Sequence, residues 1–220
     1  MGALIALLPG ELRALFPRLI DEMHDLRLGA ARAHAGRPSG AVHRLAVVDY
    51  FDSLDPLYVL ALDEAECVAG ALRLLPTTGV TMLNDAFAGA LPDGVRVESP
   101  LIWEASRLTL RGAGESRATD AAMDRTIGQL GVALNAIAEA AALTHLIGVF
   151  DGAMHRLLSH RGCAGETFAP PMRIDGAEMF PVLYDVGAAM NAPFRRLAGD
   201  APPPINLAHL ERLRPTGGRS

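Results

Sequence analysis

Short runs of apolar residues alternate along this chain with stretches in which apolar residues recur every three or four positions. The short runs predict β-strands, and they cover residues 3–8, 44–51, 57–63, 67–76, 100–110, 144–150 and 179–187. The helical spacing predicts α-helices, and these cover residues 11–34, 81–91, 121–143 and 152–162. Pro17 predicts a kink in the first helix, because proline disrupts helical hydrogen bonding.

The order of these elements indicates the fold class. It predicts an α/β fold, namely a single three-layer domain with a central mixed sheet. We expect the sheet to be antiparallel in its first half and to have crossover helices in its second. The short turn between 57–63 and 67–76 favours a hairpin there. The domain is expected to span residues 1–199, and the Pro- and Gly-rich residues 200–220 are expected to form a loose tail.

Composition narrows the classes of function. Half of the 220 residues are hydrophobic, which is enough for one full core. The formal net charge of −5 argues against nucleic acid as a partner. Cys67 and Cys163 have no metal-ligand or redox spacing, as is typical of a reduced, cytoplasmic protein. No stretch reaches the roughly 18 apolar residues of a membrane span, so no membrane partner is expected.

Charged residues interrupt the predicted strands, or in one case directly follow a strand, at positions that are normally apolar. They are Asp49, Asp52, Arg73, Glu104 and Arg107. The aspartates fit a turn before Pro56, and the other three fit a structural ion pair or an exposed strand edge. The alternative for all five is a cleft for a zwitterionic substrate, with acids near its ammonium group and arginines near its carboxylate. Glu104 and Arg107 are three residues apart, so they point to opposite faces of a strand unless a bulge intervenes.

Other motifs add little chemistry. The stretch "RGAGES" at 111–116 has the glycines of a phosphate-binding turn, but a plain loop is the better interpretation. His155, His160 and Cys163 fit one helix face and its cap, but no carboxylate joins them, so no metal site is expected.

Several stretches together resemble the acyl-homoserine-lactone synthases, the LuxI-type autoinducer synthases of bacterial quorum sensing. They occur in the order and spacing of that family. The matching stretches are "MHDLR" (23–27), "DYFDSLDPLYVLA" (49–61), "VAGALRLLPTTGVTMLNDAF" (68–87) and "IWEASRLTL" (102–110). The second half fits more weakly, through the long helix and "THLIGVFDGAMHRLLSHRGC" (144–163).

The resemblance implies a fold related to the N-acetyltransferases (GNAT-like) and an acyltransferase activity. An acyl group passes from acyl carrier protein or acyl-coenzyme A to the amine of S-adenosylmethionine, and lactonisation then releases methylthioadenosine. S-adenosylmethionine is a substrate, and no cofactor is implied. Carried over, the binding residues for S-adenosylmethionine are Arg27, Asp49, Asp52 and Arg107. The catalytic set is Glu104, Arg107 and Arg73, with Glu104 orienting the amine or accepting its proton through a water.

The chain departs from the family pattern in two places. Ala31 stands where the family has an aromatic residue, and residues 32–43 contain no aromatic at all. Those rings help to pack the S-adenosylmethionine site in the family, and Tyr50 or Phe51 is the candidate replacement. The resemblance assigns the acyl pocket to the second half, with Val149 and Phe150 as candidates. Thr144 is the only threonine in that strand, which favours an unsubstituted, branched or aryl acyl group over a 3-oxo chain.

Two alternatives stay open at this point. One is a GNAT-like N-acyltransferase with a different amine acceptor, and the other is a catalytically degenerate synthase that only binds ligand. The acyl chain, the choice between the two donors and the oligomeric state are left open by the sequence.

Overall fold

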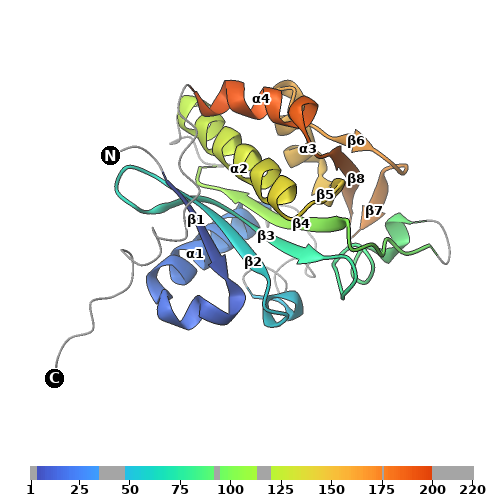
Figure 1. The fold of residues 1–220 in the computed structure, drawn as a ribbon, viewed down its shortest axis with the longest axis horizontal. Helices are drawn as coiled ribbons and strands as arrows, with labels where there is room; N and C mark the ends of the chain where they lie inside the picture. Colours follow the sequence, from blue (N-terminus) through green and yellow to red (C-terminus); the bar gives the residue numbers. More distant parts are fainter. Residues whose placement is uncertain (1–3, 35–47, 92–94, 113–119, 175, 200–220) are drawn as a thin grey trace.

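The computed structural model describes residues 4–34, 48–91, 95–112, 120–174 and 176–199 (Figure 1). The described strands are β1 (Leu4–Pro9), β2 (Leu57–Leu62), β3 (Val68–Pro76), β4 (Ile102–Leu110), β5 (His145–Asp151), β6 (Glu166–Thr167), β7 (Met172–Ile174) and β8 (Ala177–Asp185). The α-helices are α1 (Pro17–His34), α2 (Asp120–Ala140), α3 (Gly152–His160) and α4 (Ala188–Ala198). Short 3-10 helices are η1 (Gly10–Leu15), η2 (Tyr50–Ser53) and η3 (Ala88–Ala90). In these ranges, no helix has the length and apolar character needed to cross a membrane.

All of the described strands belong to one eight-stranded mixed sheet. Its strands follow the order β1-β2-β3-β4-β5-β8-β6, and β7 also pairs with β8. β4 and β5 run parallel and are joined by α2, whereas the other neighbours are antiparallel. The predicted mixed sheet is therefore confirmed, with β2 and β3 as its hairpin and α2 as a crossover helix. The expectation of several crossover helices in the second half is met only in part, because β8 runs antiparallel to β5 and α3 therefore does not join parallel strands.

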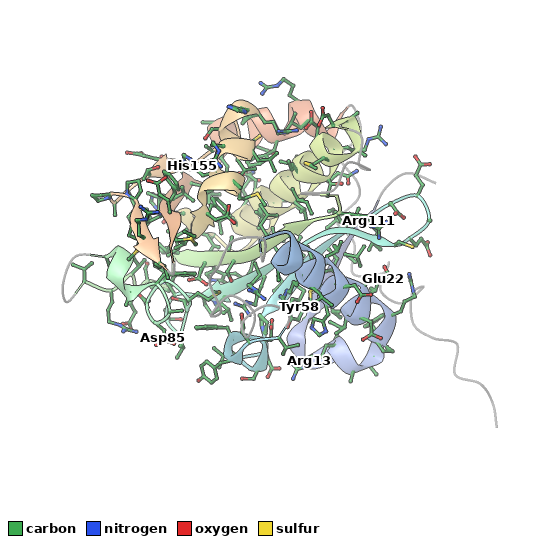
Figure 2. The ribbon with its side chains drawn as sticks, turned by 180° about the vertical axis from the view of Figure 1, so that it is seen from behind. Arg13, Glu22, Tyr58, Asp85, Arg111 and His155 are labelled. Atoms are coloured by element: carbon green, nitrogen blue, oxygen red, sulfur yellow. The ribbon has the colours of Figure 1, made fainter. Side chains whose placement is uncertain are left out.

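Helices cover both faces of the sheet, so the molecule has three layers (Figure 1). On one face, Leu19 of α1 shares a buried apolar cluster with Tyr58 of β2, and Tyr58 lies beside α1 in the view from behind (Figure 2). On the other face, Leu130 of α2 and Phe194 of α4 share a cluster with Leu72 of β3. Successive side chains of a strand point to opposite faces of the sheet, so alternate residues pack in two separate apolar cores.

Two predicted elements are wrong. The strand predicted over 44–51 is absent from its described part, where η2 begins at Tyr50 and residues 44–47 lie outside the described ranges. The helix predicted over 81–91 is a series of turns that ends in η3. The N–H groups of Asp85 and Phe87 both bond to the backbone oxygen of Met82, which is a turn pattern and not an α-helical ladder. The N–H groups of Met82 and Leu83 bond to the carboxylate of Glu104.

Other differences concern the boundaries and the shortest elements. Pro17 does not kink the first helix but begins it, because its missing N–H is not needed at a first helical position. β6, β7 and α4 have no counterpart among the predicted elements. α4 contains Pro193 and has only 11 residues, so its periodicity is short and interrupted. The predicted loose tail, 200–220, lies outside the described residues.

Candidate active site

Asp49 and Asp52 are brought together by a tight turn before β2. Asp49 caps η2 by accepting a hydrogen bond from the backbone N–H of Asp52, and Asp52 accepts one from the backbone N–H of Asp49. This reciprocal capping box fixes both backbones. The turn predicted for these two aspartates is confirmed, and both side chains point into the protein, where they are buried.

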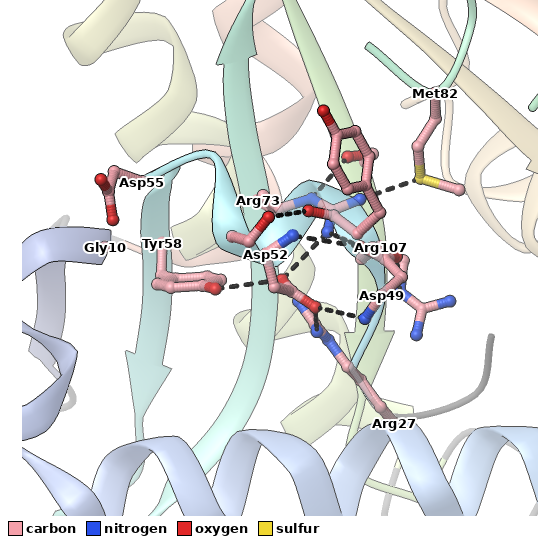
Figure 3. A network of polar contacts seen from close by, with 12 residues as sticks. Gly10, Arg27, Asp49, Asp52, Asp55, Tyr58, Arg73, Met82 and Arg107 are labelled. Carbon is pink, nitrogen blue, oxygen red and sulfur yellow. Dashed lines mark hydrogen bonds and ion pairs between the residues drawn. The ribbon is translucent and has the colours of Figure 1, made fainter. Parts of the chain in front are cut away.

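Arg73 is the centre of a buried polar network on the α1 face of the sheet (Figure 3). Its side chain is fully buried, and Nη1 donates to Asp49 and, at 2.9 Å, to Asp52. Nε donates to Ser106 Oγ at 3.3 Å, and Nη2 lies 3.0 Å from the sulfur of Met82. A planar guanidinium with several donors can hold all of these partners at once, which an ammonium group cannot.

Asp52 links this arginine to α1. Its Oδ2 accepts a hydrogen bond from Arg27 Nη1 at 2.8 Å, and its Oδ1 accepts one from the hydroxyl of Tyr58 at 3.0 Å. Burial alone would raise the pKa of Asp52, but the ion pair with Arg27 and the nearby Arg73 outweigh it and hold that pKa well below its usual value. Asp52 is therefore a fixed anion at neutral pH.

Arg107 reaches the same network because β4 contains a bulge. The register of β3 and β4 shifts between Ala71 and Arg73, and Arg107 has a φ of 60°, in the left-handed region. The extra residue turns Arg107 to the same face as Glu104, and its Nε lies 3.6 Å from Asp49 Oδ2. Burial, together with repulsion from Arg27, lowers the pKa of Arg107 to about 10, so it stays a cation at neutral pH.

Glu104 lies deeper on the same face and holds a neighbouring loop. It is 1% exposed, and its two oxygens accept the backbone N–H groups of Met82 at 3.2 Å and Leu83 at 2.7 Å. Burial raises the pKa of Glu104 despite these bonds. A carboxyl group whose pKa moves towards neutrality is better suited to accept a proton from an amine.

Three aromatic residues surround the network, and two of them already face a guanidinium group. The guanidinium carbon of Arg27 lies 5.9 Å from the ring centre of Tyr58, and that of Arg73 lies 5.4 Å from the ring centre of Phe51. Tyr50 meets Phe51 edge to face and is 60% exposed. Among the candidate replacements for the missing aromatics, only Tyr50 keeps an accessible ring.

An apolar cavity of about 40 Å³ lies on the opposite face of the sheet, under α2. The parallel pairing of β4 with β5 covers only Ile102–Glu104 and His145–Ile147, and the cavity contacts both strands just beyond it, at Ala105, Leu108 and Phe150. Of the two predicted acyl-pocket residues, Phe150 therefore lines this cavity. Val149 points to the other face, where it packs in the cluster of Leu83 and Ile147.

The structure thus brings together all six polar residues that the sequence singled out, from four separate elements. They are Arg27 of α1, Asp49 and Asp52 at η2, Arg73 of β3, and Glu104 and Arg107 of β4. Sequence reasoning missed Tyr58, Ser106 and Met82. In the β2–β3 hairpin, Tyr58 is paired with Arg73. The predicted hairpin therefore could have indicated that Tyr58 lies beside the network. In the described part of the chain, no three His, Cys, Asp or Glu residues are grouped to hold a metal ion.

Comparison with known proteins gives the family. The autoinducer synthase family model matches residues 15–189. The acyl-homoserine-lactone synthase of Ralstonia nicotianae (strain ATCC BAA-1114 / GMI1000) is 34% identical over 142 residues, which are 64% of this chain and 69% of that protein. Among solved structures, the coenzyme A-dependent acyl-homoserine-lactone synthase BjaI, with S-adenosylmethionine and isopentyl-CoA, has a TM-score of 0.70 at 20% identity over 96% of this chain and 99% of its own.

The fold comparison extends to the acetyltransferases. A predicted N-acetyltransferase from Lactobacillus plantarum has a TM-score of 0.54 at 16% identity, over 84% of this chain and 99% of its own. The GNAT-like fold expected from the sequence is therefore confirmed. The family match covers most of the chain and includes every residue of the buried network, and the chain belongs to the autoinducer synthase family.

Proposed function

We propose that this protein is an acyl-homoserine-lactone synthase. It transfers an acyl group from an acyl thioester to the amine of S-adenosylmethionine, closes the lactone and releases methylthioadenosine. The observation that carries the proposal is the placement of a buried network of three arginines and three carboxylates directly across the sheet from an apolar cavity. One face offers charged groups to an amino acid, and the other offers an apolar space to an acyl chain.

Asp49 and Arg107 are the groups that meet the amino-acid part of S-adenosylmethionine. Asp49 Oδ2 and Arg107 Nη2 are buried and have no hydrogen-bond partner among the described residues. An ammonium group supplies donors to the first, and a carboxylate supplies acceptors to the second. Arg27, Asp52 and Arg73 hold these two groups in place through the ion pairs described above.

Tyr50 is the aromatic residue that contacts the sulfonium or the adenosine. A sulfonium is a cation, and cations bind favourably over an aromatic face. The rings of Phe51 and Tyr58 are each within 6 Å of an arginine of the network, whereas Tyr50 is exposed beside it. Tyr50 would thus take over part of the role of the rings that are missing at Ala31 and in residues 32–43.

Glu104 acts in the acyl transfer. The amine of S-adenosylmethionine loses a proton to Glu104, directly or through a water, and its nitrogen then attacks the thioester carbonyl. The carbon–sulfur bond of the thioester breaks, and the thiol of the donor leaves with a proton. The two backbone N–H bonds to Glu104 leave further lone pairs on the carboxylate, and its raised pKa suits it to this step.

Lactonisation follows without a further base. The carboxylate oxygen of the acylated substrate attacks its own γ-carbon, and the bond from that carbon to the sulfonium sulfur breaks. The sulfur keeps the electron pair, so methylthioadenosine leaves as a neutral molecule. Arg107 would hold the carboxylate within reach of the γ-carbon, since a fixed geometry converts a slow encounter into a favourable intramolecular attack.

The acyl group would enter the apolar cavity beyond the paired part of β4 and β5. All of the lining side chains are apolar apart from Tyr184, whose hydroxyl donates to the backbone oxygen of Cys163. A 3-oxo group would lie there without a partner, and burying a polar group unpaired is unfavourable. An unsubstituted or branched chain is therefore the expected acyl group.

Either acyl carrier protein or coenzyme A can present such a thioester, and we keep both as donors. In the BjaI structure this fold holds S-adenosylmethionine and isopentyl-CoA, so the fold has room for both substrates. The proposal also places the enzyme in the cytoplasm, with no nucleic-acid or membrane partner.

A donor panel tests the proposal. Purified protein is mixed with S-adenosylmethionine and a series of acyl-CoA and acyl-carrier-protein donors, and acyl-homoserine lactone is measured by mass spectrometry. An Arg107→Leu variant should lose the product. Arg111→Leu is the matched control, because Arg111 follows the same strand but bonds outside the buried network, to the half-buried Asp63 and to the backbone oxygen of Val68.

Two results would overturn the proposal. Lactone from neither donor class with folded protein would contradict the synthase activity. Thioester consumption only with an amine other than S-adenosylmethionine would favour a different N-acyltransferase.

A further inference from the structure

Helix α4 forms one wall of the apolar cavity. Met190 and Phe194 of α4 line it together with Tyr184 of β8 and side chains of β4, β5 and α2. Met190 and Phe194 are themselves buried. Side chains of α4 therefore help to limit the size of any group that this cavity holds.

Phe194 is held in this place by a glycine of α2. A Cβ at Gly131 would lie only 2.1 Å from the ring of Phe194, so any other residue there would displace the ring. Gly128 lies one turn earlier in α2, and a Cβ there would lie only 2.2 Å from the backbone nitrogen of Ala198. The two glycines let α4 approach α2 closely, and Tyr184 supports Phe194 from the side with ring centres 6.3 Å apart.

We infer that Phe194 sets the longest acyl chain that this enzyme accepts. This inference rests on the proposed function, since it takes the cavity as the acyl site. A cavity of about 40 Å³ has room for about three or four water-sized groups, and a methylene is of similar size. The preferred chain is accordingly short, on the order of four to six carbons, and a longer chain meets the ring of Phe194.

Replacing Phe194 by a smaller residue enlarges the cavity at the wall formed by α4. Each additional methylene that becomes buried changes affinity by about fourfold. A chain with two more carbons than the wild-type limit should therefore gain about 15-fold in relative kcat/KM in the variant.

The experiment compares wild type, Phe194→Ala and Phe194→Leu over a series of saturated acyl donors with 4 to about 12 carbons. Leu197→Ala is the matched control, because Leu197 lies on the same helix and packs in the same core but does not line the cavity. For each variant, the kcat/KM of every donor is divided by the kcat/KM that the same variant has with the donor preferred by the wild type. A general loss of active protein then cancels in the ratio. Thermal unfolding of each variant reports whether it is folded, and Phe194→Leu decides the question if Phe194→Ala does not fold.

The expected result is a shift of the optimum towards longer chains in the Phe194 variants and an unchanged profile in Leu197→Ala. An unchanged profile in a folded Phe194 variant, or an equal shift in Leu197→Ala, would overturn the inference. Absence of lactone from every donor with the wild type would instead refute the proposed function, so the two failures can be told apart.

Discussion

Replacing Arg73 by lysine tests whether the network needs a guanidinium fork or only a positive charge. The ammonium of lysine can replace Nη1, which bonds to Asp49 and Asp52. It cannot also replace Nε, which donates to Ser106, or Nη2, which contacts Met82. Two contacts are therefore lost in a site with no solvent to compensate for them.

The magnitude follows from those two contacts. A buried hydrogen bond contributes about 0.5–1.5 kcal/mol, and leaving a buried partner unsatisfied costs about 1–3 kcal/mol. We expect Arg73→Lys to lower the free energy of unfolding by about 2 kcal/mol, which is about 4–8 °C in Tm for a chain of this size. Arg111→Lys is the control, because Arg111 is partly exposed and its partners, Asp63 and the backbone oxygen of Val68, lie outside the network. Partly exposed ion pairs contribute about 1 kcal/mol or less.

Urea unfolding measures both variants, with the fluorescence of Trp103 as the signal. Trp103 is the only tryptophan of the chain and directly precedes Glu104 in β4, so it reports on the sheet that carries the network. Binding of S-adenosylmethionine is titrated in parallel, and it should weaken in Arg73→Lys but not in Arg111→Lys. Equal stability and equal binding in the two variants would refute the importance of the fork.

Three further predictions concern single groups of the site. Glu104→Gln leaves one of two backbone N–H groups without an acceptor, so it should lower the free energy of unfolding by about 1–3 kcal/mol. It should also lower turnover by about 100-fold or more. If urea unfolding and rate measurements show proportional losses of stability and turnover, Glu104 has no catalytic role. Tyr50→Ala should raise the KM for S-adenosylmethionine about two- to fivefold with kcat unchanged, while Tyr50→Phe stays near wild type in steady-state kinetics. The pKa of Asp52 in the folded protein lies well below its ordinary value of 3.8. Its ion pairs therefore contribute their full stability above that pH, and the contribution declines as the pH falls from there towards the lower pKa of the folded state. Urea unfolding from about pH 6 down to about pH 2 should show this decline mainly at the acidic end, and a flat curve would contradict it.

Much of the fold could be predicted because its longest elements have strong local patterns. The helix α2 has 21 residues, and β2 and β3 are joined by a short turn, so both the crossover and the hairpin follow from spacing alone. The buried charges at Arg73 and Glu104 were visible as polar residues inside apolar runs. The family resemblance then gathered them with Arg27, which no local pattern connects to the sheet.

The remainder depends on contacts between distant segments. The bulge at Arg107 is set by the register of β3 against β4, which the spacing of β4 by itself does not reveal. The expected helix over 81–91 is replaced by turns, in which the N–H groups of Asp85 and Phe87 both bond to the backbone oxygen of Met82. The carboxylate of Glu104, about 20 residues later, holds the start of this loop. The cavity wall at Phe194 depends on α4 packing against Gly131, and a short helix with an internal proline gave no sign of that contact.

The stoichiometry of methylthioadenosine and acyl-homoserine lactone tests the central claim most directly. Both products are quantified by mass spectrometry in one reaction that contains the purified protein, S-adenosylmethionine and the best acyl donor. The proposed chemistry predicts equal molar amounts at every time point, because each lactone closure expels one methylthioadenosine. Acylated product without methylthioadenosine, or methylthioadenosine without lactone, would contradict the assignment of this network as the site of lactone synthesis.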